Sequence, residues 1–352
     1  MGGLTGDALT DADRNVAVGY TALGGDTLGS DSVAIGANTL RAQNFTTATT
    51  SYNTAVGSGA GRNISTGVKN TIIGASAADA LTDADFNTAV GYSALTADTL
   101  GSRSTAVGHF ALADQNFTTA TDTHNTAIGA VAGAVITTGI KNTLIGSEAG
   151  DALTDADFNV AVGNFALSAD TLGSKSVAIG RAALTSQNFT TATDTYNVAV
   201  GYDAGVSVTT GVNNTFVGGL AGDGTDDGFG NTAVGQLALS GNCGNDNTAL
   251  GKGAGQIVTG SDNTLIGHQA GHTITSGDFN VCLGHEAGVN QISTADNLLY
   301  IARSGAAAGN DQCWIHGTAT GTCINGDNST AWAQTSDRRI KKNITDSSVG
   351  LA

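Results

Sequence analysis

The chain has 352 residues, a formal net charge of −16, 51 glycines and no proline. So acidic a chain is a poor partner for nucleic-acid phosphates or an anionic membrane surface, since both require clustered Lys and Arg. Aromatic residues make up 5% of the chain, fewer than the thick core of an enzyme of this length needs. No apolar run reaches the length of a transmembrane helix, and we expect no signal peptide. The composition favours thin, stacked layers of small side chains.

The sequence repeats with a period of 72 residues, because the segment Ala-Leu-Thr-Asp-Ala-Asp begins at Ala8, Ala80 and Ala152. Inside each period a motif of Asn or Ser, then Thr or Val, an apolar residue, Val or Ile, and Gly recurs at spacings of 17, 21, 17 and 17. Short repeats of this kind indicate a solenoid. A solenoid shaft is expected over residues 1–300. It should comprise cassettes 15–86, 87–158 and 159–230, regular coils over 231–296 and a degenerate copy at Asn297.

Each coil is numbered here from its Asn or Ser, taken as position zero. Position two is always apolar, position three is always aliphatic, position four is Gly, and position seven is Ala except at Thr39. Short β-branched runs bounded by Gly are typical of strands, whose successive side chains point to opposite faces. The sequence therefore predicts an all-β fold, a parallel β-solenoid of about 16 coils. At about 4.8 Å a coil the rod would be roughly 75–80 Å long.

The strand is apolar on both faces, because positions two and three are both apolar. A thin coil can bury only one face, so the other should pack on a partner, most simply the same strand of an identical chain. The Asn at position zero has two compatible interpretations: an axial ladder of side-chain amides, or a turn residue that tolerates a left-handed backbone. The residue after the Gly varies and is expected to face solvent.

One coil in each cassette is four residues longer than the others. Its excess lies in the segment Gln-Asn-Phe-Thr-Thr-Ala-Thr, which begins at residues 43, 115 and 187. The sequence predicts a bulge from the rod at each copy, with Phe45, Phe117 and Phe189 either exposed or tucked under the loop.

The repeat Asn87-Thr-Ala-Val-Gly-Tyr-Ser-Ala-Leu95 resembles those of trimeric left-handed β-rolls, as in the heads of trimeric autotransporter adhesins. It is still more similar to the repeats of bacteriophage tail fibres. The resemblance covers about residues 8–300 and implies a left-handed β-roll in an intertwined or side-by-side homotrimer. The adhesin repeat is shorter, nearer 14 residues, so strand and turn details need not transfer.

The segment Thr335-Ser-Asp-Arg-Arg-Ile-Lys-Lys-Asn-Ile344 resembles the start of the endosialidase-type intramolecular chaperone domain of phage tail spikes and fibres. In that family the domain trimerises, sets the register of three chains and often cuts itself off. The resemblance implies Ser336 as the residue after the cut and Lys341 as its base. The alternative is a solvated basic patch. We therefore expect a C-terminal cap or tip region over 301–335 and a truncated chaperone start over 336–352.

Two further groups of residues are weaker candidate sites, and each has a structural alternative. The acidic pairs Asp11/Asp13, Asp83/Asp85 and Asp155/Asp157 could bind calcium but are expected to be solvated turns. His268 and His285 share a coil position, with His272 nearby, and a surface ladder is expected rather than a metal site. The cysteines are expected as buried free thiols, or as a Cys313–Cys323 pair. No hydrolytic triad, P-loop or dinucleotide motif is present.

The function that these patterns favour is the structural shaft and receptor-binding part of a phage tail fibre. The expected partners are two further copies of the chain, tail or baseplate proteins, and a host-surface glycan or protein, with no cofactor, metal, nucleic acid or membrane insertion. Apart from the self-cleavage that Ser336 and Lys341 could perform, no enzymatic activity is expected. The alternatives are a bacterial trimeric adhesin or a contractile-injection-system fibre, and less so an ice-binding or carbohydrate-active solenoid.

Overall fold

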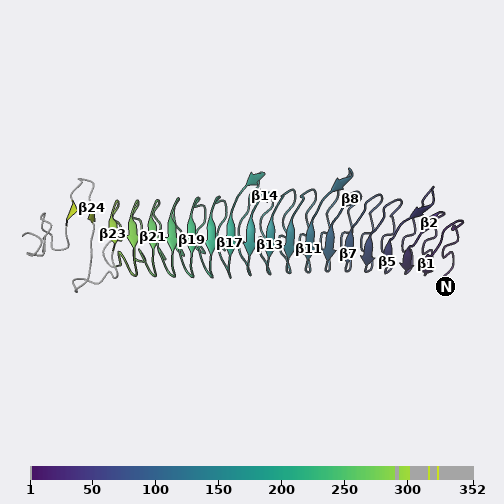
Figure 1. Ribbon diagram of the computed structural model, residues 1–352, viewed down its shortest axis with the longest axis horizontal. Helices are drawn as coiled ribbons and strands as arrows, with labels where there is room; N and C mark the ends of the chain where they lie inside the picture. Colours follow the sequence, from purple (N-terminus) through teal and green to yellow (C-terminus); the bar gives the residue numbers. More distant parts are fainter. Residues whose placement is uncertain (1, 290–292, 302–315, 318–322, 325–352) are drawn as a thin grey trace, which may run out of the picture.

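The computed structural model describes residues 2–289, 293–301, 316–317 and 323–324. Within these ranges the chain is all-β and forms one long stack of coils (Figure 1). One three-residue strand per coil joins a 17-stranded parallel sheet that runs the length of the rod. This confirms the predicted parallel β-solenoid; the left-handed roll and the trimer stay predictions.

The strands of the long sheet occupy positions one to three of successive coils. They pair in strict register, so that Val16, Ala17 and Val18 lie beside Val33, Ala34 and Ile35. The strands are β1 (Val16–Val18), β3 (Val33–Ile35), β5 (Thr54–Val56), β6 (Thr71–Ile73), β7 (Thr88–Val90), β9 (Thr105–Val107), β11 (Thr126–Ile128), β12 (Thr143–Ile145), β13 (Val160–Val162), β15 (Val177–Ile179), β17 (Val198–Val200), β18 (Thr215–Val217), β19 (Thr232–Val234), β20 (Thr248–Leu250), β21 (Thr264–Ile266), β22 (Val281–Leu283) and β23 (Leu299–Ile301).

The remaining strands are short and lie outside the long sheet. They form parallel pairs at the three 21-residue coils and one antiparallel pair near the C-terminus. These pairs are β2 (Gly29–Ser30) with β4 (Thr49–Thr50), β8 (Gly101–Ser102) with β10 (Thr121–Asp122), β14 (Gly173–Ser174) with β16 (Thr193–Asp194), and β24 (His316–Gly317) with β25 (Cys323–Ile324).

The core lies inside the coils and is built from small side chains. Position two and the Ala of position seven are buried in nearly every coil, as Ala55 and Ala60 illustrate. Where a core side chain is large, a glycine lies next to it. The ring of Phe216, for example, occupies the space in which a Cβ on Gly222 would lie, at 2.5 Å. Close packing of this kind keeps the volume of each layer constant although its residues differ.

The glycine at position four is required by both backbone conformation and space. At Gly146 φ is +139°, and a Cβ there would lie 2.5 Å from the carbonyl oxygen of Gly163 in the next coil. No side chain fits between two stacked backbones at that distance. The repeating Gly is therefore what lets adjacent coils approach closely enough to hydrogen bond.

The Asn at position zero forms the predicted ladder. Asn142 is buried, and its Nδ2 donates to the carbonyl of Ala156 at 2.7 Å within its own coil. Its Oδ1 accepts the backbone N–H of Asn159 in the next coil at 2.9 Å. Each amide thus closes one coil and ties it to its neighbour.

The left-handed interpretation of this Asn is wrong. The residue that adopts the left-handed backbone is the one before it, as at Lys69 with φ +61° and Phe86 with φ +60°. These non-glycine residues are held there by hydrogen bonds between coils, such as that from Lys69 N–H to the Ser51 carbonyl at 2.7 Å. A conformation that is unfavourable locally is stabilised by the stacking.

The last coil of the long sheet corrects the predicted register. Leu299 pairs with Val281, which is at position one, so Leu298 and not Asn297 occupies position zero. Accordingly, the backbone N–H of Leu298 donates to Asn280 Oδ1 at 3.0 Å, while Asn297 takes the left-handed conformation. The prediction placed position zero one residue too early because Asn297 matches the residue type of the motif. The described residues contain no helix able to span a bilayer.

Candidate functional site

The outward face of the long sheet carries a continuous aliphatic row. The side chains at position three point away from the coil interior, and none of them is buried in the single chain. Ile145 is 37% exposed and Val18 47%. The most exposed members are Val18, Ile35, Ile73, Ile128, Ile145, Ile179, Leu250 and Ile266. Large apolar patches on a soluble protein mark interaction sites. A single chain therefore covers one strand face and leaves the other open, as the sequence predicted.

Basic and aromatic residues line one edge of this aliphatic row. They occupy the position before the Asn, where the left-handed backbone turns the side chain outward. Along the rod they stack as cation–π pairs: the Lys69 ammonium and Arg103 guanidinium lie 4.9 Å and 4.8 Å from the Phe86 ring centroid. Lys141 lies 4.9 Å from the Phe158 centroid. The basic residues at this position end at Lys175, and Asp31, Asp246 and Asp262 occupy it in other coils, so the edge is cationic only over part of the rod.

The opposite edge consists of the residues that follow the Gly. They are mostly exposed, as predicted, and Tyr20 is 56% and Tyr202 57% exposed. Arg181 lies over the Tyr202 ring at 5.3 Å, and the His268 and His285 rings stack with centroids 5.0 Å apart. The expected histidine surface ladder is thereby confirmed. No cluster of three or more metal-ligating side chains occurs among residues that the structure describes.

The three long coils form bulges, which are the second candidate surface. Each is a parallel two-stranded pair beside the rod, and two of them, at β8 and β14, stand clear of it on the same side in Figure 1. Phe45, Phe117 and Phe189 are 5–7% exposed. They are tucked under the loop, which was one of the two expected arrangements, and they anchor its base.

A buried polar cluster supports each bulge. In the first, Gln43 Nε2 donates to Asp26 Oδ2 at 2.6 Å and to Ser32 Oγ at 2.9 Å. Asn53 Nδ2 donates to Gln43 Oε1 at 2.9 Å, and the Ser32 and Ser51 hydroxyls lie 2.5 Å apart. The same contacts recur with Asp98, Gln115, Ser104, Thr123 and Asn125, and with Asp170, Gln187, Ser176, Thr195 and Asn197.

The carboxylate of this cluster is held by hydrogen bonds alone. Asp98 Oδ1 accepts the backbone N–H groups of Gly101 at 3.0 Å and Phe117 at 3.1 Å, and the residue has no solvent-exposed surface. Burial raises the pKa of Asp98 and of Asp170, and hydrogen bonds from the glutamine and the backbone oppose that rise. Because no solute can reach the carboxylate, its chemical role is to fix the loop and not to react.

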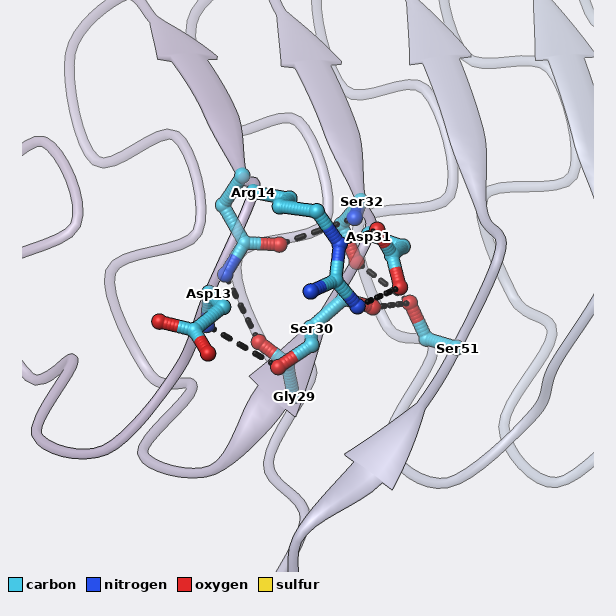
Figure 2. Close-up of polar contacts among 8 residues, drawn as sticks. Asp13, Arg14, Gly29, Ser30, Asp31, Ser32 and Ser51 are labelled. Atoms are coloured by element: carbon cyan, nitrogen blue, oxygen red, sulfur yellow. Dashed lines mark hydrogen bonds and ion pairs between the residues drawn. The ribbon is translucent and has the colours of Figure 1, made fainter.

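Ion pairs lie on the surface beside the bulges and differ between them. At the first, the Arg14 guanidinium forms a bidentate pair with Asp31, with Nε–Oδ1 at 2.5 Å and the second contact at 2.7 Å (Figure 2). This guanidinium holds the pKa of the half-buried Asp31 carboxyl below its usual value. At the second and third bulges Arg103 pairs with Asp122 at 3.0 Å, and Lys175 with Asp194 at 2.5 Å.

The predicted acidic pairs hold neighbouring coils together. Asp83 Oδ1 accepts from Thr66 Oγ1 at 2.7 Å, and Asp85 Oδ1 accepts the backbone N–H of Val68 at 2.7 Å. Asp155 and Asp157 make the same contacts one cassette later. Each of these residues therefore serves as a turn residue bonded to the preceding coil, in line with the structural interpretation.

Other sequence predictions fall partly outside the described residues. Cys243 and Cys282 are free and buried, and burial raises the pKa of the Cys282 thiol to about 12. Cys313, Ser336 and Lys341 lie outside the described residues, so the proposed disulfide and self-cleavage pair stay predictions. Sequence reasoning missed the Asp–Gln clusters and the cation–π edge.

These features define a solenoid repeat protein with one unpartnered sheet face and three rigid lateral bulges. Comparison of the chain with protein-family models, curated proteins and solved structures gave no significant match. The aliphatic row and the three bulges are therefore the two candidate functional surfaces.

Proposed function

We propose that the chain is the shaft and host-surface-binding part of a bacteriophage tail fibre, assembled as a homotrimer. The observation that carries this proposal is the aliphatic row at position three, which runs along all 17 strands of the long sheet. A row of this length and regularity calls for a partner of equal length and the same coil spacing. A further copy of the chain meets both requirements.

A trimer is compatible with the shape of this face. Trimerisation would bring the aliphatic rows of three chains to one axis and leave most of each coil's perimeter in solvent. The net charge of −16 per chain would then lie on the outside and keep the rod soluble. The resemblance of residues 335–344 to a trimerising chaperone domain supports the same stoichiometry.

A mechanical role follows from the hydrogen bonds between coils. Each Asn amide joins two coils, and each strand pairs with both neighbours, so an axial load would be shared by many parallel bonds. A shaft that connects a particle to a cell surface needs this stiffness and has no need of a catalytic pocket.

Immunogold labelling tests the proposal. An antibody raised against residues 15–86 should label fibres on tailed particles released from the source cells, seen by electron microscopy. Labelling of the bacterial surface in place of particles would overturn the phage assignment and support the adhesin alternative. Labelling of neither would contradict both.

A further inference from the structure

The exposed tips of the three bulges are identical, although the surfaces around them are not. Each tip carries Asn, Thr, Thr and Ala, as at Asn44 and Thr46–Ala48, and these residues are exposed in all three copies. In the same bulged coil the exposed position after the Gly is His109 in one cassette and Arg181 in another. Some exposed positions thus vary between cassettes, whereas the tip does not. The exposed Asp11, Asp83 and Asp155 are also unchanged, but Asp83 and Asp155 bond the preceding coil.

Packing explains only part of this identity. The glutamine and phenylalanine of the segment are buried and bonded, and the asparagine accepts from a threonine of the preceding coil, as Thr27 Oγ1 does to Asn44 Oδ1 at 3.0 Å. The hydroxyls of Thr46 and Thr47 make no hydrogen bond with any described residue. The same is true of Thr118, Thr119, Thr190 and Thr191. Three pairs of free hydroxyls are thus presented on three equivalent supports.

The supports are rigid, which lowers the entropy lost on binding. Each tip is fixed from below by the buried phenylalanine and by the Asp–Gln cluster, and its second strand pairs with the preceding coil. A pre-ordered loop loses little freedom when it contacts a ligand.

An exposed aromatic ring follows each tip at the same coil position. Tyr52 is 58% exposed, and His124 takes the equivalent place in the second cassette. Tyr196 is 53% exposed, although the Lys175 ammonium lies 5.2 Å from its ring centroid. The neutral hydroxyls of a tip can exchange hydrogen bonds with the hydroxyls of a sugar, and a ring in the same coil can pack against the apolar C–H face of a further sugar unit of the same chain. The tip itself is uncharged, and the acidic residues of the neighbouring bulge strands, Asp122 and Asp194, are paired with Arg103 and Lys175.

We propose that the three bulge tips are equivalent binding sites for a neutral glycan with a repeating structure. Adjacent bulges are four coils apart, about 19 Å at the spacing of parallel strands. One polysaccharide chain could therefore contact several tips at once. Weak single contacts would then add to a firm attachment through effective concentration. This inference rests on the proposed function and names the chemistry of its receptor.

The test is binding of the purified full chain to an array of defined neutral and acidic oligosaccharides and polysaccharides. Wild type should bind at least one neutral polysaccharide. Changing both threonines to valine in all three tips (T46V, T47V, T118V, T119V, T190V and T191V) should weaken that binding about 100-fold, because valine keeps the shape and removes the hydroxyl. Changing a single tip should weaken it about 10-fold, through lost avidity.

The matched control removes two hydroxyls elsewhere on the rod, with Ser58→Ala and Ser147→Ala, both exposed and outside the bulges. It should bind as wild type does. Unchanged binding by the six-substitution variant, binding to acidic glycans only, or no binding to any glycan would each overturn the inference. Circular dichroism and light scattering on the same samples report folding and assembly. A folded trimer that binds no glycan would therefore contradict the glycan sites without contradicting the trimeric shaft.

Discussion

At the scale of single residues, the rod depends on side chains whose bonds reach the next coil. The Asn of position zero is buried and uses both ends of its amide, one within its coil and one on the following backbone. An unsatisfied polar group left in such a place costs about 1–3 kcal/mol. Because most coils repeat the arrangement, with Ser at position zero only in the three bulged coils and Leu298 in the last coil, the ladder helps to set the register of the stack.

Asn142→Ala should therefore lower the local stability of its coil by about 2–4 kcal/mol, since it leaves the Ala156 carbonyl and the Asn159 N–H without partners. Native-state hydrogen exchange of strands β12 and β13 would measure the loss. Asn164→Ala is the matched control, because Asn164 is exposed and makes one bond to the Ser147 carbonyl. Equal amide protection of β12 and β13 in the two variants would contradict the stabilising role of the Asn ladder.

The glycine of position four allows a second prediction at this scale. Gly146→Ala places a Cβ 2.5 Å from the Gly163 carbonyl oxygen at φ +139°, and we expect a loss of more than about 2 kcal/mol in stability. Gly219→Ala should be nearly neutral, since a Cβ there meets nothing closer than 4.0 Å. Thermal unfolding of the two variants side by side tests the difference, and a stable Gly146→Ala protein would refute the close-contact explanation.

At the scale of elements, each bulge is a loop built around a buried carboxylate. Burying the charged form of Asp98 costs desolvation free energy. Hydrogen bonds from Gln115 and from the backbone N–H groups of Gly101 and Phe117 offset that cost. Its raised pKa means that the folded state binds a proton more tightly than the unfolded state. The contribution of this group to stability is thus greatest at acid pH and declines as pH rises through the raised pKa.

Comparison with Asp98→Asn isolates this effect. The stability of wild type relative to the variant should increase as pH is lowered from about 7 to about 4, because only wild type can neutralise the buried group. Chemical denaturation at several pH values gives the difference. A stability difference that is flat with pH, or that shrinks on acidification, would show that the carboxylate is not held as described.

The positions of the bulges could be predicted from the sequence, but the polar clusters that support them were not predicted. Their positions and the coil length follow from spacing, since 21-residue coils must place four extra residues somewhere. The polar clusters were missed because each joins side chains from adjacent coils, such as Asp26 and Gln43. A signal was present: both occupy a coil position that is Ile64 or Leu81 in other coils. A polar residue at a core position in two successive coils could have predicted the pair.

The register of the last coil could not be predicted in the same way. Asn297 matched the motif by residue type, yet the backbone places Leu298 at position zero. The preceding position accepts many residue types, including Asn, once stacking stabilises its left-handed backbone. Residue identity alone therefore did not separate the two neighbouring positions.

At the scale of the whole molecule, the aliphatic row decides whether one chain is a complete protein. Ile145 lies in the middle of that row and is 37% exposed. Ile145→Asp should break the trimer, since it would bury three carboxylates near one axis, while the coils of each chain stay folded. Ser147→Asp, two residues away in the same coil, should leave assembly unchanged. Size-exclusion chromatography resolves the two outcomes, and assembly of Ile145→Asp like wild type would place the interface elsewhere.

The most direct measurement is the solution mass of the unaltered chain by multi-angle light scattering. A homotrimer built on the aliphatic row should have three times the mass of the 34.8 kDa chain, about 104 kDa, over a range of concentrations. A folded, soluble monomer of 34.8 kDa would contradict it, because the row at position three would then face water along the full length of the rod.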